Sequence, residues 1–315
     1  MLLPDLLKQK PDRHIREMII GQLLIDYGFL ARDTIGESRC GRPIDLLSIG
    51  NRRQQVLFTA GFHGMEWLTT LLMLRFVDDL CFAVMTGKSL CGVRVGAFLN
   101  RRGLAVVPCV NPDGIEIQIH GADSAENYRN IVLQVCGGDT VHWQANAAGV
   151  DINHNFSAGW ESLHKQEQEA GITKPAPTRY GGEYPESEPE SRTIASYCRT
   201  GNITHALAFH SQGEEIYWQY GNYREPEAFR MAKMLAYASS YRMNDPVGLA
   251  VGGGFKDWFV EKFRRPAFTV EIGKGENPLP LDMLADIYIR LREMLVLAVV
   301  LSTQRLIEMF SVCYK

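Results

Sequence analysis

The chain has 315 residues, of which 46% are hydrophobic and 22% are charged, and this balance is typical of a globular protein with a sizeable core. The formal net charge is −3 and the pI is close to 6.3, so the composition offers no electrostatic basis for binding nucleic acid or an anionic membrane. We therefore expect neither partner. No repeat, low-complexity tract or linker divides the sequence, which predicts one domain over residues 1–315, with residues 1–40 as a helical lead-in.

Seven cysteines are scattered through the sequence without a CxxC pair. An odd number of dispersed cysteines, several of them inside apolar runs, indicates buried free thiols rather than disulfides. The first residues do not show the basic region and continuous apolar stretch of a signal peptide. The apolar run 294–302 is too short to span a bilayer. Together these features predict a cytoplasmic location.

Apolar runs and turn residues predict strands that alternate with helices. We expect strands at 44–49, 55–61, 104–110, 203–209 and 267–272, with a further candidate at 215–220. We expect helices at 65–85, 186–200, 226–241 and 281–309, and a turn at 111–114. This alternation predicts an α/β fold with a central mixed, mostly parallel twisted sheet flanked by helices on both faces.

One long region stands outside this alternation. Residues 123–187 are rich in Gly, Asn and Pro and lack periodicity, and so long an irregular region inside a compact domain is usually functional. The acidic residues at 183–190 are expected to form a loop and the acidic start of the next helix, where they complement its dipole.

A histidine and a glutamate stand three residues apart, at His63 and Glu66, directly after a predicted strand. This spacing puts both side chains on one side of a helical turn, so both can reach one ion. His210 and Glu271 end two other predicted strands, and sites in such sheets lie beyond the carboxyl ends of the strands. Two imidazoles and a carboxylate suit Zn²⁺ with a fourth position left for water, which predicts one catalytic zinc per chain.

Seven short motifs occur in the order found in the zinc carboxypeptidase family of funnelin-type metallopeptidases, and the sequence resembles that family from about residue 41 onward. They are HGMEW (63–67), NPDG (111–114), GVDINHNF (149–156), YGGEYPESEPES (180–191), FHSQGEEIYW (209–218), GGGFKDW (252–258) and FTVEIG (268–273). The resemblance implies that His63, Glu66 and His210 bind zinc and that Glu271 is the catalytic carboxylate. It also implies an enzyme that hydrolyses amide bonds, with Glu271 passing a proton from water to the leaving amine.

The residues expected to bind substrate depart from the family pattern. The family's carboxypeptidases grip a terminal carboxylate with an Asn-Arg pair, and here the pair reads Asn153-His154. Histidine cannot form the bidentate fork of arginine, so His154 is either a weaker binding group or a packed side chain. Gln144 stands where an oxyanion-side arginine is expected, and Arg129 or Arg179 could supply that charge instead.

Within the family, the sequence is similar to the bacterial γ-D-glutamyl-diaminopimelate peptidases. The similarity lies in WQAN (143–146) ahead of GVDIN and in PTRYGG (177–182). It implies cleavage of peptidoglycan stem peptides, so the expected partner is a peptide or muropeptide substrate. Lys256 stands at the base of the family's specificity pocket and would favour a carboxylate on the substrate, unless it only lies along the first turn of a helix.

Two alternatives remain open at this point. One is a conventional metallocarboxypeptidase that releases acidic C-terminal residues. The other is a zinc-containing peptide-binding protein without catalysis. Glu271 speaks against the second alternative, whereas Gln144 and His154 keep it open.

Overall fold

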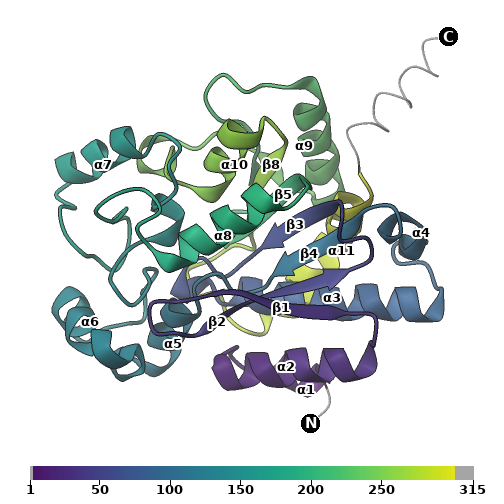
Figure 1. Ribbon diagram of the computed structural model, residues 1–315, viewed down its shortest axis with the longest axis horizontal. Helices are drawn as coiled ribbons and strands as arrows, with labels where there is room; N and C mark the ends of the chain where they lie inside the picture. The colour runs from purple at the N-terminus through teal and green to yellow at the C-terminus, as the bar shows by residue number, and fades with distance from the viewer. Residues whose placement is uncertain (1–2, 302–315) are drawn as a thin grey trace.

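The computed structural model describes residues 3–301, and its centre is an eight-stranded mixed sheet (Figure 1). The strand order is β1-β2-β4-β3-β5-β8-β6-β7. The strands are β1 (Ala31–Glu37), β2 (Pro43–Ile49), β3 (Gln55–Thr59), β4 (Gly103–Val107), β5 (Ile203–Ser211), β6 (Glu215–Tyr217), β7 (Arg242–Met243) and β8 (Ala267–Ile272). The central strands β4, β3, β5 and β8 run parallel, whereas β2 and β6 pair with them antiparallel. The predicted fold class is confirmed.

Helices cover both faces of this sheet. They are α1 (Leu3–Leu6), α2 (Arg13–Asp26), α3 (Leu68–Thr86), α4 (Val95–Leu99), α5 (Pro112–His120), α6 (Arg129–Cys136), α7 (Trp160–Glu169), α8 (Pro189–Thr200), α9 (Pro226–Ser239), α10 (Phe255–Phe263) and α11 (Met283–Val300). In Figure 1, α8 crosses in front of the sheet and α3 runs behind it. Every residue of β3 and β4 is buried, because both faces of the sheet are covered.

The lead-in and the turn at 111–114 differ from their predictions. The lead-in contains an edge strand, β1, whose polar and half-buried residues hide the apolar pattern of a strand. The predicted turn is the start of α5. There the side chain of Asn111 accepts a hydrogen bond from the Gly114 N–H (2.8 Å), and Pro112 occupies the first helical turn.

The region predicted to be irregular contains α6 and α7, together with the 3₁₀ turns η2 (Ala122–Tyr128) and η3 (Ile152–His154). It lies beyond the carboxyl ends of the parallel strands, on the left in Figure 1. Helix α11 ends at Val300, and the predicted continuation at 302–309 lies outside the described residues.

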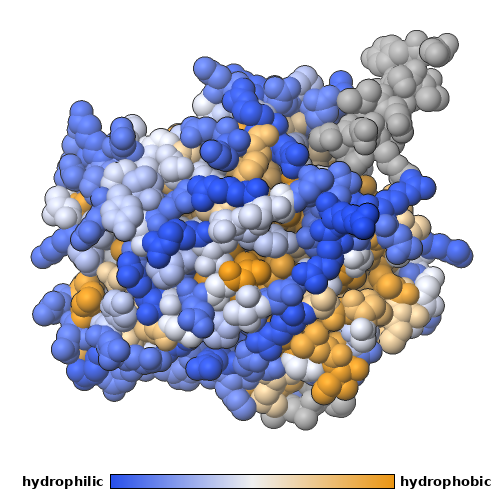
Figure 2. Space-filling model, viewed as in Figure 1, coloured by the Kyte–Doolittle hydropathy of each residue, from blue (hydrophilic) through white to orange (hydrophobic). Residues whose placement is uncertain are grey.

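Most of the surface in view is hydrophilic (Figure 2). Exposed apolar side chains lie near the end of α2 (Ile25), in the turn that follows it (Phe29) and near the end of α3 (Phe82 and Met85), and an apolar area appears in that part of the face. Within residues 3–301, no helix combines the length and the apolar character that a membrane crossing requires.

Candidate active site

The ends of three parallel strands meet at a cavity of about 510 Å³. His63 follows β3, while His210 and Glu271 are register partners on the neighbouring strands β5 and β8. Register partners project their side chains from the same face of a sheet, so these two side chains are neighbours. The predicted site residues that line the cavity are His63, Glu66, Gln144, Asn153, His154, Arg179, His210, Lys256 and Glu271.

Glu66 lies between two imidazoles. Its Oε1 is 2.9 Å from Nδ1 of His63, and its Oε2 is 3.1 Å from Nδ1 of His210. One ligand atom from each of these three residues lies within 4.8 Å of the others. The turn that carries Glu66, η1 (Gly64–Glu66), needs glycine at its start, because a Cβ on Gly64 would stand 2.2 Å from the carbonyl oxygen of Gly114.

Asp151 orients one of these imidazoles. Its Oδ1 lies 3.1 Å from Nε2 of His63, and its carboxylate also accepts hydrogen bonds from the backbone N–H groups of Asn153 and Arg179. A carboxylate on the far nitrogen is the usual partner of a metal-binding histidine. Asp151 was not predicted as a site residue, although the motif GVDINHNF contains it.

The charges around the triad favour a cation. Burial raises the pKa of Glu66, but the adjoining His63 and His210 overcome this effect and hold it below its usual range. Burial lowers the pKa of His63, yet the carboxylates of Glu66 and Asp151 raise it well above its ordinary value. Two imidazoles and one carboxylate, converging with a second carboxylate behind them, match the ligand preference of Zn²⁺. The His63/Glu66/His210 triad therefore fits a single catalytic zinc, as predicted.

Glu271 faces the cavity beside the triad. Burial, and after it the negative charge of Glu66, raise the pKa of Glu271 well above its ordinary value. Its neighbour across β6, Glu215, is occupied by hydrogen bonds from Tyr217, Arg242 and Asn244. A carboxyl group at this position can act as a general base toward a water bound beside it.

Asn153 and His154 form another part of the wall. Asn153 Oδ1 accepts a hydrogen bond from the Phe255 N–H (3.0 Å), which leaves its amide NH₂ group for the cavity. His154 lines the cavity while its Nδ1 lies 2.8 Å from Oε1 of Glu167 on α7. Sequence reasoning missed Glu167, because α7 was not predicted and nothing in the spacing links the two residues.

The two arginines proposed for the oxyanion side lie in different places. Arg179 lines the cavity, and its backbone N–H donates to Oδ2 of Asp151 (2.9 Å). Arg129 starts α6 and forms an exposed ion pair with Asp123, and it is not among the cavity-lining residues. Arg179 is therefore the better placed of the two. The Gln144 side chain lines the cavity and accepts a hydrogen bond from Thr178.

Lys256 is buried on the first turn of α10 and lines the cavity with its neighbour Asp257. Its Nζ forms an ion pair with the Asp257 carboxylate and donates to the carbonyl oxygen of Gln219 (2.8 Å). Lys256 lies on the first turn of the helix, but its side chain is buried and does not extend into solvent. Its ammonium group is paired with the carboxylate of Asp257, which was not predicted as a site residue.

Glu188 and Glu190, from the acidic segment at the start of α8, are buried. Their role therefore goes beyond the predicted interaction with the helix dipole. Glu188 accepts hydrogen bonds from Arg39 Nε (2.8 Å) and Asn146 Nδ2 (2.7 Å). Glu190 is buried beside it, and this burial raises the pKa of Glu190 to about 8. These contacts hold Asn146, and with it the loop that leads to Asp151.

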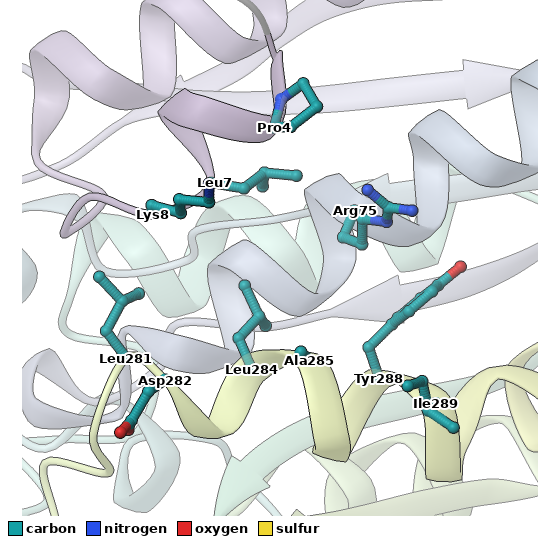
Figure 3. Close-up of a pocket in the computed structure, with 10 residues that line it drawn as sticks. All are labelled: Pro4, Leu7, Lys8, Arg75, Leu281, Asp282, Leu284, Ala285, Tyr288 and Ile289. Carbon is teal, nitrogen blue, oxygen red and sulfur yellow. The ribbon is translucent and has the colours of Figure 1, made fainter.

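A second, larger cavity of about 860 Å³ lies between α1, α3 and α11 (Figure 3). Apolar side chains dominate its wall, among them Leu7, Leu284, Tyr288 and Ile289. None of the predicted site residues lines it.

Comparisons with known proteins agree with this geometry. The sequence profile of the family described as zinc carboxypeptidase matches residues 20–288. The chain is 36% identical over 272 residues to "Gamma-D-glutamyl-L-diamino acid endopeptidase 1" of Lysinibacillus sphaericus, covering 85% of this chain and 67% of that protein.

Solved structures show the same fold. Bovine thrombin-activatable fibrinolysis inhibitor superimposes with a TM-score of 0.73 at 19% identity, over 93% of this chain and 97% of that one. The murein-tripeptide amidase MpaA from Escherichia coli O157 superimposes with a TM-score of 0.53 at 20% identity, over 84% of this chain and 91% of that one. With most of its length matched by the family profile and a zinc triad at the ends of its parallel strands, the chain belongs to the zinc carboxypeptidase family and is a zinc metallopeptidase.

Proposed function

We propose that this peptidase cleaves the amide bond between the side-chain carboxyl of D-glutamate and diaminopimelate in peptidoglycan stem peptides. The observation that carries the proposal is the buried Lys256–Asp257 pair in the wall of the cavity. The side chain of diaminopimelate ends in both a carboxylate and an ammonium group, and the pair offers a partner of opposite charge for each. The 36% identity to a protein named as a γ-D-glutamyl-diamino acid endopeptidase supports the same substrate class.

Zinc, when bound by the triad, polarises the scissile carbonyl and lowers the pKa of water. Glu271 takes the proton of the attacking water and returns it to the leaving amine, because it lines the cavity together with the triad. Asn153, His154 and Arg179 bind and orient the substrate from the cavity wall. Gln144 lines the same cavity, and its side-chain oxygen accepts a hydrogen bond from the Thr178 hydroxyl.

We propose that the enzyme is cytoplasmic and that its substrates there are muropeptides. The six cysteines of the described residues, Cys40, Cys81, Cys91, Cys109, Cys136 and Cys198, are free thiols. This supports a reducing compartment.

The test is a comparison of three substrates with zinc-loaded protein: a stem peptide with diaminopimelate, the same stem with lysine, and an ordinary peptide with a C-terminal glutamate. Cleavage is followed by mass spectrometry. We expect kcat/KM for the diaminopimelate stem to exceed that for the lysine stem by about ten- to hundred-fold, the value of one charge-assisted contact in a desolvated pocket.

Each alternative predicts a different result in the same experiment. Equal cleavage of both stems would remove the role given to Lys256 and Asp257. Efficient release of the C-terminal glutamate would identify a conventional carboxypeptidase for acidic residues. Binding of the stems with zinc in place and no cleavage would identify a peptide-binding protein.

A further inference from the structure

The buried carboxylate of Glu167 lies behind His154 in the cavity wall and is not part of the metal-binding triad. Glu167 of α7 is completely buried, and its Oε1 lies 2.8 Å from Nδ1 of His154. Its Oε2 accepts a hydrogen bond from the Gly181 N–H (3.1 Å) and lies 3.3 Å from Nδ1 of His164. A buried charge is costly unless several donors compensate it, and here three groups do so.

The segment around His154 is built to hold this contact. A Cβ on Gly181 would stand 2.7 Å from the carbonyl oxygen of His154 and 3.2 Å from Oε1 of Glu167. A Cβ on Gly253 would come within 2.4 Å of Leu163 on α7 and 2.7 Å of the same carbonyl oxygen. The backbone of His154 is therefore packed closely against Gly181 and Gly253, and both glycines lie close to side chains of α7.

The helix is anchored on the side that faces Gly181. Trp160 stacks on His164 with ring centroids 4.5 Å apart and an interplanar angle of 10°, and its indole N–H donates to the carbonyl oxygen of Gly181 (2.9 Å). These contacts place the start of α7 and the loop at Gly181 in one rigid unit with Glu167.

We propose that Glu167 is a positioning residue that fixes the ring of His154 and makes Nε2 the nitrogen that meets the substrate. A carboxylate only accepts hydrogen bonds, so Nδ1 of His154 carries a proton. Nδ1 is then occupied, and Nε2 is the nitrogen left for the cavity that the ring lines. The carboxylate of Glu167 lies 2.8 Å from Nδ1, on the side of the ring away from the cavity. An anionic group of the substrate that binds at Nε2 brings a proton to this nitrogen and receives a charge-assisted hydrogen bond, at the position where the family has arginine.

The identity of the group that binds Nε2 depends on the proposed function. The proton on Nδ1 depends only on the contact with Glu167. The first test therefore needs no substrate. Two-dimensional ¹H–¹⁵N spectra of the histidine rings in zinc-loaded protein report which nitrogen of His154 carries the proton. We expect a protonated Nδ1 in the wild type, and an unprotonated Nδ1 would overturn the proposal.

The variant Glu167→Gln sharpens this readout. The N–H of Gly181 requires the amide oxygen of the glutamine at the position of Oε2, so the amide NH₂ group faces Nδ1 of His154. That NH₂ group donates, and the ring proton moves to Nε2. His164→Asn is the matched control, because His164 contacts the same carboxylate but does not line the cavity, and it should leave the His154 signals unchanged.

Kinetics separate positioning from general support of the fold. We expect Glu167→Gln to raise KM for the stem peptide about ten-fold with kcat little changed, since a charge-assisted contact made on binding is lost. In a His154→Ala background the same substitution should change nothing further. An equal rise in KM in both backgrounds would overturn the proposal. If no stem peptide is cut at all, the proposed substrate fails while the ring spectra still decide the role of Glu167. If Glu167→Gln does not fold, the wild-type spectrum alone decides it.

Discussion

Two of the cavities within residues 3–301 differ in size and in the kind of side chain that lines them. The hollow between α1, α3 and α11 is the larger, at about 860 Å³ against about 510 Å³. Its wall is mainly apolar, and burying apolar side chains is favourable without any partner. The smaller cavity holds ionisable groups out of water, which is unfavourable unless each is compensated.

The compensation follows a pattern. Glu66 is compensated by two imidazoles, Lys256 by Asp257, and His154 by Glu167. Glu271 has no such partner of opposite charge on its own strand or on β6, and the pKa of its carboxyl is raised by burial and by Glu66. Buried ionisable groups with shifted pKa values cluster at functional sites. The charged lining of this cavity therefore locates the active site better than the cavity volume does.

The largest effects on kcat and on zinc content are expected from changing Glu271, the general base, or His210, a metal ligand, in the active-site cavity. Glu271→Gln should retain close to one zinc per chain and lose about 10²–10⁴-fold in kcat, because only the general base is removed. His210→Ala should lose zinc itself, because one of three ligands is gone. Metal analysis and initial rates on the same preparations separate the two effects. Full zinc occupancy in His210→Ala would show that the ligand set is wrong.

Breaking the Lys256–Asp257 ion pair tests how much this buried pair contributes to the free energy of unfolding. Lys256→Met leaves the buried carboxylate of Asp257 with the Gly252 N–H but without a counter-charge, and should lower the free energy of unfolding by about 3 kcal/mol. The double variant Lys256→Met/Asp257→Asn should recover part of this loss, since no isolated charge remains. Denaturant unfolding measures both. Equal stability of the single variant and the wild type would mean that the pair is not desolvated.

Removing the partner behind the metal ligand should have a smaller effect. Asp151→Asn should weaken zinc affinity by about 10–100-fold, because His63 loses the carboxylate that orients its ring. Asp257→Asn is the control, because it removes a buried carboxylate from the same cavity without touching a ligand, and its zinc affinity should match that of the wild type. Competition with a chelator gives both values.

The smallest effect is expected in the apolar hollow. Ile289→Glu places a charge at its rim, where the side chain is 68% exposed, and should change stability by no more than about 0.5 kcal/mol. Both kcat/KM and zinc content should stay at wild-type values. A ten-fold drop in kcat/KM would mean that the cavity between α1, α3 and α11 takes part in the reaction.

The metal side of the site was accessible from the sequence. Its strands are buried on both faces, so their apolar runs stand out, and His63, His210 and Glu271 follow or end them. Glu66 lies three residues from His63, and a local turn is enough to bring the two together. Predictions from short stretches of polar residues were less reliable. The edge strand β1 was not predicted and was included in the helical lead-in. The helix start at Asn111 was predicted as a turn, because Asn, Asp and Gly favour turns and Asn also favours helix starts.

The partners of the charged groups had to come from tertiary structure. His63 and Asp151 are separated by 88 positions. His154 ends the turn η3, whereas Glu167 belongs to α7, a helix that was not predicted. The choice between Arg129 and Arg179 depended on which of them folds toward the cavity. The sequence shows which residues are able to bind a metal or carry a charge, because that is a property of side-chain chemistry and of spacing within one turn or strand. Which of them are taken out of water together is settled only by packing, since desolvation and pairing are properties of the assembled interior.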